Sequence, residues 1–308
     1  MPEHHRPWKR WAAYAAFALA SFLFALRQTL PVQAIAERLE VEAAAAGWQL
    51  RTADVAPAGV VGLRMDAVTL ESADGARIPL EQVTAKLRLL PLLIGRRSLD
   101  FDLRLWDGRV AGLLEQARGS RRIEAKVEGL NLGRAAAMRK LAHVDLAGTA
   151  NGDLSLALNE REPAKSTGRL DLTVAQAAIN GGEVPVAAMG GGALTLPRIG
   201  LGTITAKAEV KDGKAVFDAL SAKGGEDLEA ESEGLYFVVQ ERLAQAPLFG
   251  RARLRFRDAF WQKGGTAGLR GITELALAPG RGPDGSYGLQ LFGTLSNPQT
   301  RPAPAPGR

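Results

Sequence analysis

The sequence of 308 residues contains no cysteine, which excludes disulfides and thiolate metal sites. Histidine is almost absent too: His4 and His5 lie close to the N-terminus, and the third is His143. A histidine metal site or a Ser–His–Asp triad would therefore depend on His143 alone, whose place at the start of an alternating segment favours a structural role. We expect no catalytic residue, no metal and no cofactor, and therefore a protein that is not an enzyme.

Aromatic residues are also scarce, at 6% of the chain, whereas the net charge is +6 and the pI is about 9.8. Nucleic-acid binding favours a basic patch interleaved with stacking aromatics. Here most basic residues are scattered, so we expect no nucleic-acid partner. A basic surface of this kind suits anionic lipid headgroups or acidic partner proteins.

The longest apolar run is Trp11–Leu26, which contains no charge, proline or glycine. Basic residues stand before it, and Arg27 follows directly. We predict a transmembrane anchor over 8–27, with 1–7 in the cytoplasm and the rest of the chain across the membrane. A cleaved secretory signal is the alternative. The side chains expected in the bilayer are Trp11, Tyr14, Phe17, Leu19, Phe22, Leu23, Phe24 and Leu26.

The segment 28–47 has the pattern of an amphipathic helix. Pro31 suits a first helical turn, and apolar residues then recur at helical spacing until Gly47, which suits the end of a helix. Such a stripe favours a helix that caps the end of a β core; a helix that docks a partner is the alternative.

From Trp48 the period of the apolar residues changes to two, as in strands with one apolar and one wet face. We predict a mainly β protein with a large, strongly curved antiparallel sheet over 48–296. One short helix is expected around Leu132–Leu141. The proline-rich end, 297–308, is predicted to be disordered.

Asp-Gly and Asn-Gly pairs suit the tight turns between such strands. Two pairs lie between clearly alternating runs: Asp107–Gly108 in LRLWDGRVAGLL and Asn151–Gly152 in LAGTANGDLSLAL. We expect hairpins at both. Further pairs occur at 74–75, 180–181, 212–213 and 284–285.

A sheet of a dozen or more strands curls, splits or closes. We expect a trough whose inside is apolar, and either a closed core or an open groove remains compatible with the sequence. The residues expected to line the trough are Leu87, Leu99, Phe101, Leu103, Leu105, Leu154, Leu156, Leu170, Leu172, Phe237, Leu254 and Phe256.

Four arginines share one face of a predicted strand: Arg251, Arg253, Arg255 and Arg257. They favour a solubilised strand or an edge strand guarded by charge, with contact to phosphate or to an acidic partner as the alternative. The run Gly190–Gly192 lacks the Lys-Ser/Thr of a P-loop, so it does not indicate a phosphate site.

The layout then resembles a known family. WQLRTADVAPAGVVGLRMDAVTL, followed by VTAKLRLLPLLIGRRSLDFDLRLWDGRVAGLL, is similar to the opening of AsmA-like exported β proteins. DGKAVFDALSAKGGEDLEAESEGLYFV and YGLQLFGTLSNPQTRPAP resemble the type II secretion system protein N (general secretion pathway protein N) family. The resemblance runs from about Trp8 to Pro298.

This resemblance implies a bacterial inner-membrane protein with a single span and its β domain in the periplasm. Its partners would be other envelope proteins of the type II secretion machinery, reached through strand edges or the curved sheet. AsmA-like proteins are also associated with lipid movement. The alternative function is therefore lipid binding or transfer, with acyl chains shielded in the trough.

Overall fold

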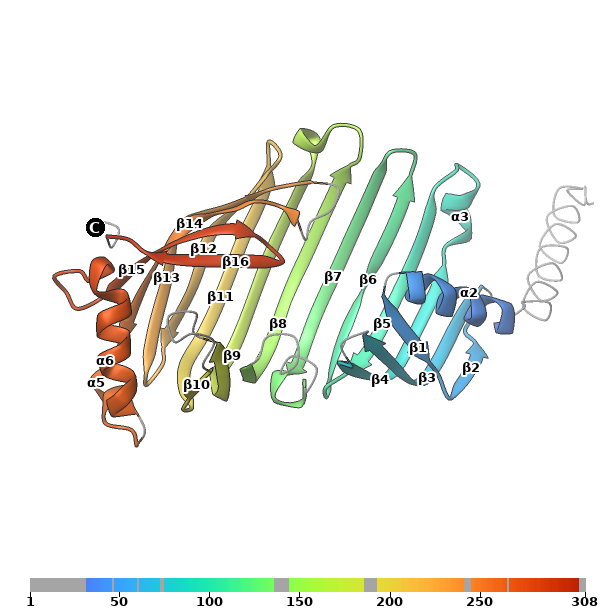
Figure 1. Ribbon diagram of the computed structural model, residues 1–308. Coiled ribbons are helices and arrows are strands. Elements are labelled where there is room, and N and C mark those ends of the chain that lie inside the picture. The colour runs from blue at the N-terminus through green and yellow to red at the C-terminus, as the bar shows by residue number, and fades with distance from the viewer. Residues whose placement is uncertain are drawn as a thin grey trace, which may run out of the picture.

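The computed structural model describes residues 32–45, 47–59, 61–72, 75–135, 144–185, 193–240, 245–264 and 266–304. These residues form one antiparallel sheet of 16 strands, in which almost every strand pairs with its neighbours in the chain. The predicted mainly β, antiparallel class is confirmed. The sheet is open: β1 and β2 lie at one edge and β16 at the other (Figure 1).

The first half of the sheet contains β1 Trp48–Arg51, β2 Asp54–Pro57, β3 Gly62–Ser72, β4 Arg77–Leu87, β5 Arg97–Leu105, β6 Gly108–Ala117, β7 Ser120–Asn131 and β8 Val144–Asn159. The second half contains β9 Thr167–Pro185, β10 Ala193–Leu196, β11 Ile199–Lys211, β12 Lys214–Gly224, β13 Leu228–Val238, β14 Leu248–Phe256, β15 Tyr287–Thr294 and β16 Asn297–Pro302. The described helices are α2 Val32–Ala45, α3 Leu89–Leu92, α5 Asp258–Trp261 and α6 Thr266–Leu277, with 3₁₀ turns η1 Leu132–Arg134, η2 Pro163–Lys165 and η5 Ala278–Gly280.

The predicted hairpin between β5 and β6 is present, but its central residues are Trp106 and Asp107. Both have positive φ, 50° and 62°, as a type I′ turn requires. Asp212–Gly213 joins β11 to β12 in the same way, with φ of 51° and 71°. Gly108 instead begins β6.

The predicted hairpin at Asn151–Gly152 is wrong, because both residues lie inside the continuous strand β8. Asn180–Gly181 likewise lies inside β9. Asn151 is opposite Thr173 of β9, and its Oδ1 accepts a hydrogen bond from the Gly129 N–H at 2.8 Å. Partners on both sides keep β8 extended where the local dipeptide favours a turn.

The ends of the sheet carry the helices (Figure 1). The predicted amphipathic segment contains α2, which packs against β1 and β2 as the expected cap. At the other end α5 and α6 were not predicted. There Phe256 of β14 lies 5.3 Å from Phe260 and 5.1 Å from Trp261 between ring centroids. Aromatic packing therefore holds this cap to the sheet.

The predicted disordered tail is wrong over Asn297–Pro302, because these residues form β16 and pair with β15. The predicted short helix begins as the 3₁₀ turn η1, and the rest of it lies outside the described residues. The predicted anchor, 8–27 with its listed side chains, the cytoplasmic segment 1–7, His143 and Gly190–Gly192 also lie outside them.

No helix in the described part of the chain has the length and apolar character needed to cross a membrane.

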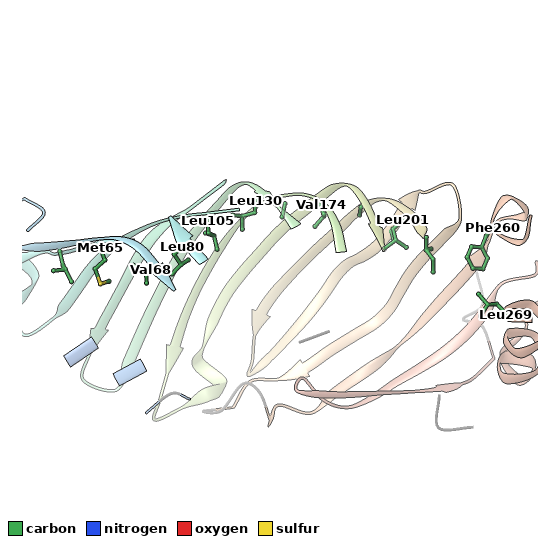
Figure 2. Packing of buried hydrophobic residues seen from close by; sticks show 14 residues of the cluster. Met65, Val68, Leu80, Leu105, Leu130, Val174, Leu201, Phe260 and Leu269 are labelled. Atoms are coloured by element: carbon green, nitrogen blue, oxygen red, sulfur yellow. The ribbon is translucent and has the colours of Figure 1, made fainter. Parts of the chain in front are cut away.

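The buried core is a band that runs along the sheet rather than a centre between two layers (Figure 2). Val68 in β3 is only 1% exposed, and Phe260 at the far end of the same cluster is 2% exposed. Ile35 of α2 packs against this band, as does Trp261 of α5. Both end caps therefore lie on the same, apolar face of the sheet.

Candidate functional site

The candidate site is the apolar face of the sheet, which the strand register builds from rows of side chains. In an antiparallel sheet, directly opposed residues point to the same face. The near row follows the buried band: Met65, Val83, Leu103, Val110, Val127, Gly152, Leu172, Ala206 and Leu220. The middle row is Leu63, Ala85, Phe101, Gly112, Ala125, Leu154, Leu170, Ala208 and Phe217. The far row is Leu87, Leu99, Leu114, Ile123, Leu156, Gly168, Val210, Ala215, Phe237 and Leu248.

These rows contain no charged residue, although they cross the sheet from β3 or β4 to β12 and beyond. Strands β4 to β9, β11 and β12 each contribute one residue to each row because their residues alternate between faces. The apolar face is therefore continuous across strands that are far apart in the sequence. Such continuity is what an extended apolar ligand or a broad apolar partner surface requires.

The twelve residues predicted to line a trough all lie on this face. Nine belong to the three rows by register, and Leu105 is the next inward-facing residue after Leu103 in β5. Leu254 and Phe256 lie on the same face of β14, opposite Ala230 and Leu228 of β13. Leu105 is buried, at 8% exposed, whereas the other eleven are only half buried.

Between β5 and β9, coverage of this face decreases away from the buried band. It does not do so toward the two sides of the sheet, where Leu63 of the middle row is 4% exposed and Ala215 and Leu248 of the far row are 1% and 8% exposed. Leu130 and Val174, in the band, are 9% and 7% exposed, whereas Leu114 in the far row is 39% exposed. In the described part of the chain, the strands between β5 and β9 contact mainly their own sheet neighbours. Over these strands the far row is therefore shielded by adjacent side chains and not by a second layer.

Glycines on this face allow close approach between strands. A Cβ at Gly112 would lie 2.0 Å from the backbone oxygen of Glu124 and 2.7 Å from Cζ of Phe101. The space above Gly112 is thus already occupied by the neighbouring strand and the Phe101 ring. Glycine inside a strand commonly marks such an approach or a bend.

The opposite face is charged and largely satisfied by its own ion pairs. Arg88 Nη2 lies 2.7 Å from Asp100 Oδ1, and Lys207 Nζ lies 3.0 Å from Asp171 Oδ2. A hydrogen bond from the Arg109 side chain holds the pKa of Asp102 below its usual range. A hollow of about 720 Å³ on this face lies between β4 and β9 and has both acidic and basic lining residues. This face is therefore the solvated side of the sheet.

The arginine-rich strand is not an edge strand, so the edge expectation is wrong. A strand solubilised by its charges fits, because Arg251, Arg255 and Arg257 are exposed. The arginine-rich strand is β14, which pairs with both β13 and β15. The register places glutamates of β13 directly opposite its arginines: Glu229 opposite Arg255, Glu231 opposite Arg253 and Glu233 opposite Arg251. These glutamates supply the opposite charge within the chain itself, so the strand does not require phosphate or an acidic partner.

One buried ion pair joins the sheet to its C-terminal cap. Asp227, in the turn before β13, is fully buried. Its Oδ2 accepts hydrogen bonds from Lys263 Nζ at 2.5 Å and from the Gly200 N–H at 2.6 Å. Lys263 follows α5, so this contact connects the cap to the strand ends. The arrangement has a structural role.

Sequence reasoning missed two features, the α5–α6 cap and the apolar tip of the β4–β5 loop. Leu269, Ile272 and Leu277 recur at helical spacing, and Pro279 follows, which together indicate a helix. The tip, LLPLLIG, is an apolar run bounded by arginines. Its exposure depends on tertiary packing and could not be read from the run itself.

Among the described residues, no group of three or more His, Asp or Glu side chains lies close enough to hold a metal ion. Comparison with protein-family models, curated proteins and solved structures found no match to the chain.

Proposed function

We propose that this chain is a non-enzymatic component of the type II protein secretion machinery, anchored in the bacterial inner membrane with its sheet in the periplasm. The resemblance of its sequence segments to the protein N family supports the assignment. The observation that carries it is the continuous apolar face, which is left half exposed on an open sheet. A contiguous apolar surface of this kind marks a contact site.

The edges of the sheet are less suited to partner binding than its face. Edge strand β16 contains Pro298 and Pro302, which cannot donate backbone hydrogen bonds to an added strand. The opposite edge is divided into the short strands β1 and β2, against which α2 packs. We therefore assign partner contact to the apolar face and not to strand addition at the edges.

Lipid binding or transfer is the second candidate, and the declining coverage of the rows between β5 and β9 favours it. The middle and far rows would form the inner wall of a trough that shields an acyl chain from water. Each methylene group removed from water contributes about 0.8 kcal/mol, so a chain lying across several strands would bind favourably. This function needs no catalytic group.

A secretion assay tests the first proposal. A deletion strain is complemented with the parent chain, Leu156→Lys or Ser155→Lys, and folded exported enzyme is measured in the medium and in the periplasm. Leu156 belongs to the apolar far row, whereas Ser155 is the preceding residue and faces the charged side. We expect the parent and S155K to restore secretion, and L156K to leave enzyme in the periplasm.

Normal secretion by the deletion strain, together with a leaky and detergent-sensitive outer membrane, would contradict the secretion role and favour lipid handling. The second candidate is tested directly with the purified full-length chain and a fluorescent fatty acid. We expect L156K to weaken binding by about tenfold, the equivalent of losing contact with one or two methylene groups, and S155K to leave it unchanged. Equal weak binding by all three chains would contradict lipid binding.

A further inference from the structure

The loop between β4 and β5 exposes the most apolar surface segment in the described part of the chain. Leu90 is 79% exposed, Leu93 is 83% exposed and Ile94 is 71% exposed. These side chains belong to α3 and the turn that follows it, here called the β4–β5 tip, residues 89–95. The tip lies outside the three apolar rows and has no place in the sheet.

The β4–β5 tip is an ordered structure. The N–H groups of Leu93, Ile94 and Gly95 donate to carbonyl oxygens three residues earlier, at 3.2, 3.2 and 3.0 Å. Gly95 has a φ of +73°, which turns the chain back toward β5. At the base, the Arg88 N–H donates to the Ser98 carbonyl at 2.8 Å, and Ser98 itself is buried. The fold therefore presents the apolar side chains to solvent in a defined geometry.

Other turns at the same end of the strands are polar. The β6–β7 turn is Arg118–Gly119, the β8–β9 connection contains Glu160–Glu162, and the β11–β12 turn is Asp212–Gly213. Polar turns of this kind are the ordinary solution for a loop in water. The apolar composition of the β4–β5 tip is thus specific to one loop.

Arginines surround the base of the tip. Arg88 and Arg96 pair with Asp100 and Glu115, at 2.7 and 3.3 Å, and both remain more than half exposed. Arg97 is exposed and makes no ion pair with any described residue. No acidic residue occurs between positions 88 and 98. An apolar tip above a basic collar matches the acyl boundary and the phosphate layer of an anionic bilayer.

We propose that the β4–β5 tip inserts into the interface of an anionic membrane, with Leu90, Leu93 and Ile94 in the acyl boundary and the arginines at the phosphates. One turn of α3 is about 6 Å long, which is comparable with the depth that interfacial segments reach. The tip and α2 both lie on the side of the sheet that the first strands form (Figure 1). Insertion there would orient the apolar face relative to the membrane, and it does not depend on which partner that face binds.

The absence of cysteine makes a direct test available. In the full chain, reconstituted in vesicles, a single cysteine at Leu93→Cys or at Leu275→Cys is labelled with an environment-sensitive fluorophore. Leu275 on α6 is the matched control, because it is 81% exposed but lies at the opposite end of the sheet. The vesicles are purely zwitterionic or contain anionic phosphatidylglycerol, each with and without quencher-labelled acyl chains.

We expect the label at position 93 to shift to the blue in anionic vesicles and to be quenched by the labelled acyl chains, while the label at 275 stays aqueous. Adding Leu90→Ser should lower the ratio of inserted to aqueous tip by about tenfold or more, because one leucine side chain is lost from the apolar layer. Adding Arg96→Gln and Arg97→Gln should remove the preference for anionic vesicles.

A label at position 93 that remains aqueous in both kinds of vesicle would overturn the proposal and leave a protein partner as the occupant of the tip. Equal insertion in zwitterionic and anionic vesicles would overturn the role of the arginines. The secretion and fatty-acid assays above probe the apolar face, so their failure is distinguishable from failure of insertion.

Discussion

Replacing Leu114 with lysine tests whether the apolar face is open. Leu114 lies in the far row between Leu99 and Ile123 and is 39% exposed. On an uncovered face, the lysine stem can lie along the neighbouring apolar side chains while its ammonium group reaches water. Under a second layer, the same charge would be buried without a partner.

The exposed fraction of Leu114 sets the expected change in the free energy of unfolding. Burying a whole leucine side chain is worth about 1.5–3 kcal/mol, and roughly three-fifths of Leu114 is covered, so removing it costs about 1–2 kcal/mol. The lysine stem recovers part of this, leaving an expected loss of about 1 kcal/mol in the free energy of unfolding. A covered position would instead lose about 2–5 kcal/mol for the leucine and more for the buried charge.

The assay is urea unfolding of the purified chain, followed by fluorescence of its tryptophans, with Val68→Ala as the reference for a covered site. Val68 is 1% exposed, and losing two buried methyl groups with partial cavity formation should cost about 2–3 kcal/mol. A loss above about 3 kcal/mol for L114K would refute the open face, because an uncovered position should lose only about 1 kcal/mol, whereas a covered one loses a buried leucine and gains a buried charge.

Three other substitutions test individual contacts. Lys263→Met leaves the buried carboxylate of Asp227 without its cation, and denaturant unfolding should show a loss of about 2–3 kcal/mol, below the usual range for a buried pair because Lys263 is 34% exposed. Gly112→Ala places a methyl group against a neighbouring backbone oxygen, and we expect thermal unfolding to show a loss of about 1–3 kcal/mol. The pKa of Asp102 is lowered by the hydrogen bond from Arg109, so this carboxylate stabilises the fold above the usual aspartate pKa near 4, and the contribution is lost as pH falls through the lowered value. Asp102→Asn should therefore reduce the loss of stability measured between about pH 5 and pH 2.

Controls accompany these substitutions. Glu274→Gln breaks an exposed pair with Arg270 on α6 and leaves Arg270 over the Trp261 ring, so its cost should stay near 0.3–0.5 kcal/mol. If K263M costs no more than E274Q, the Asp227 contact is not a buried pair. A Gly112→Ala chain as stable as the parent would mean that the strands can separate at that point, and an unchanged acid titration of D102N would contradict the role of Arg109.

The local sequence correctly predicted the strand class, most strand positions and which side chains of one strand share a face. This is possible because the two-residue alternation is a property of the extended backbone, independent of any neighbour. For the same reason, Leu99, Phe101 and Leu103 could be assigned to one face of β5 without knowing what lies beside them.

Elements whose local signal was weak or ambiguous were predicted poorly. Asn151–Gly152 favours a turn by its dipeptide, yet pairing with β7 and β9 keeps it in a strand. The proline-rich composition of the C-terminal segment predicts a disordered end, yet part of it forms β16. Prolines are compatible with this strand because the exposed side of an edge strand requires no hydrogen-bond donor.

The sequence alone therefore determined that this protein builds long antiparallel strands with an apolar and a charged side. Only the tertiary structure decided that residues such as Phe101, Leu154 and Phe217 form one continuous row, that the glutamates of β13 face the arginines of β14, and that Leu93 is left in solvent. The physical reason is that alternation is set within a strand, whereas register and coverage depend on hydrogen bonds and contacts between strands distant in the chain.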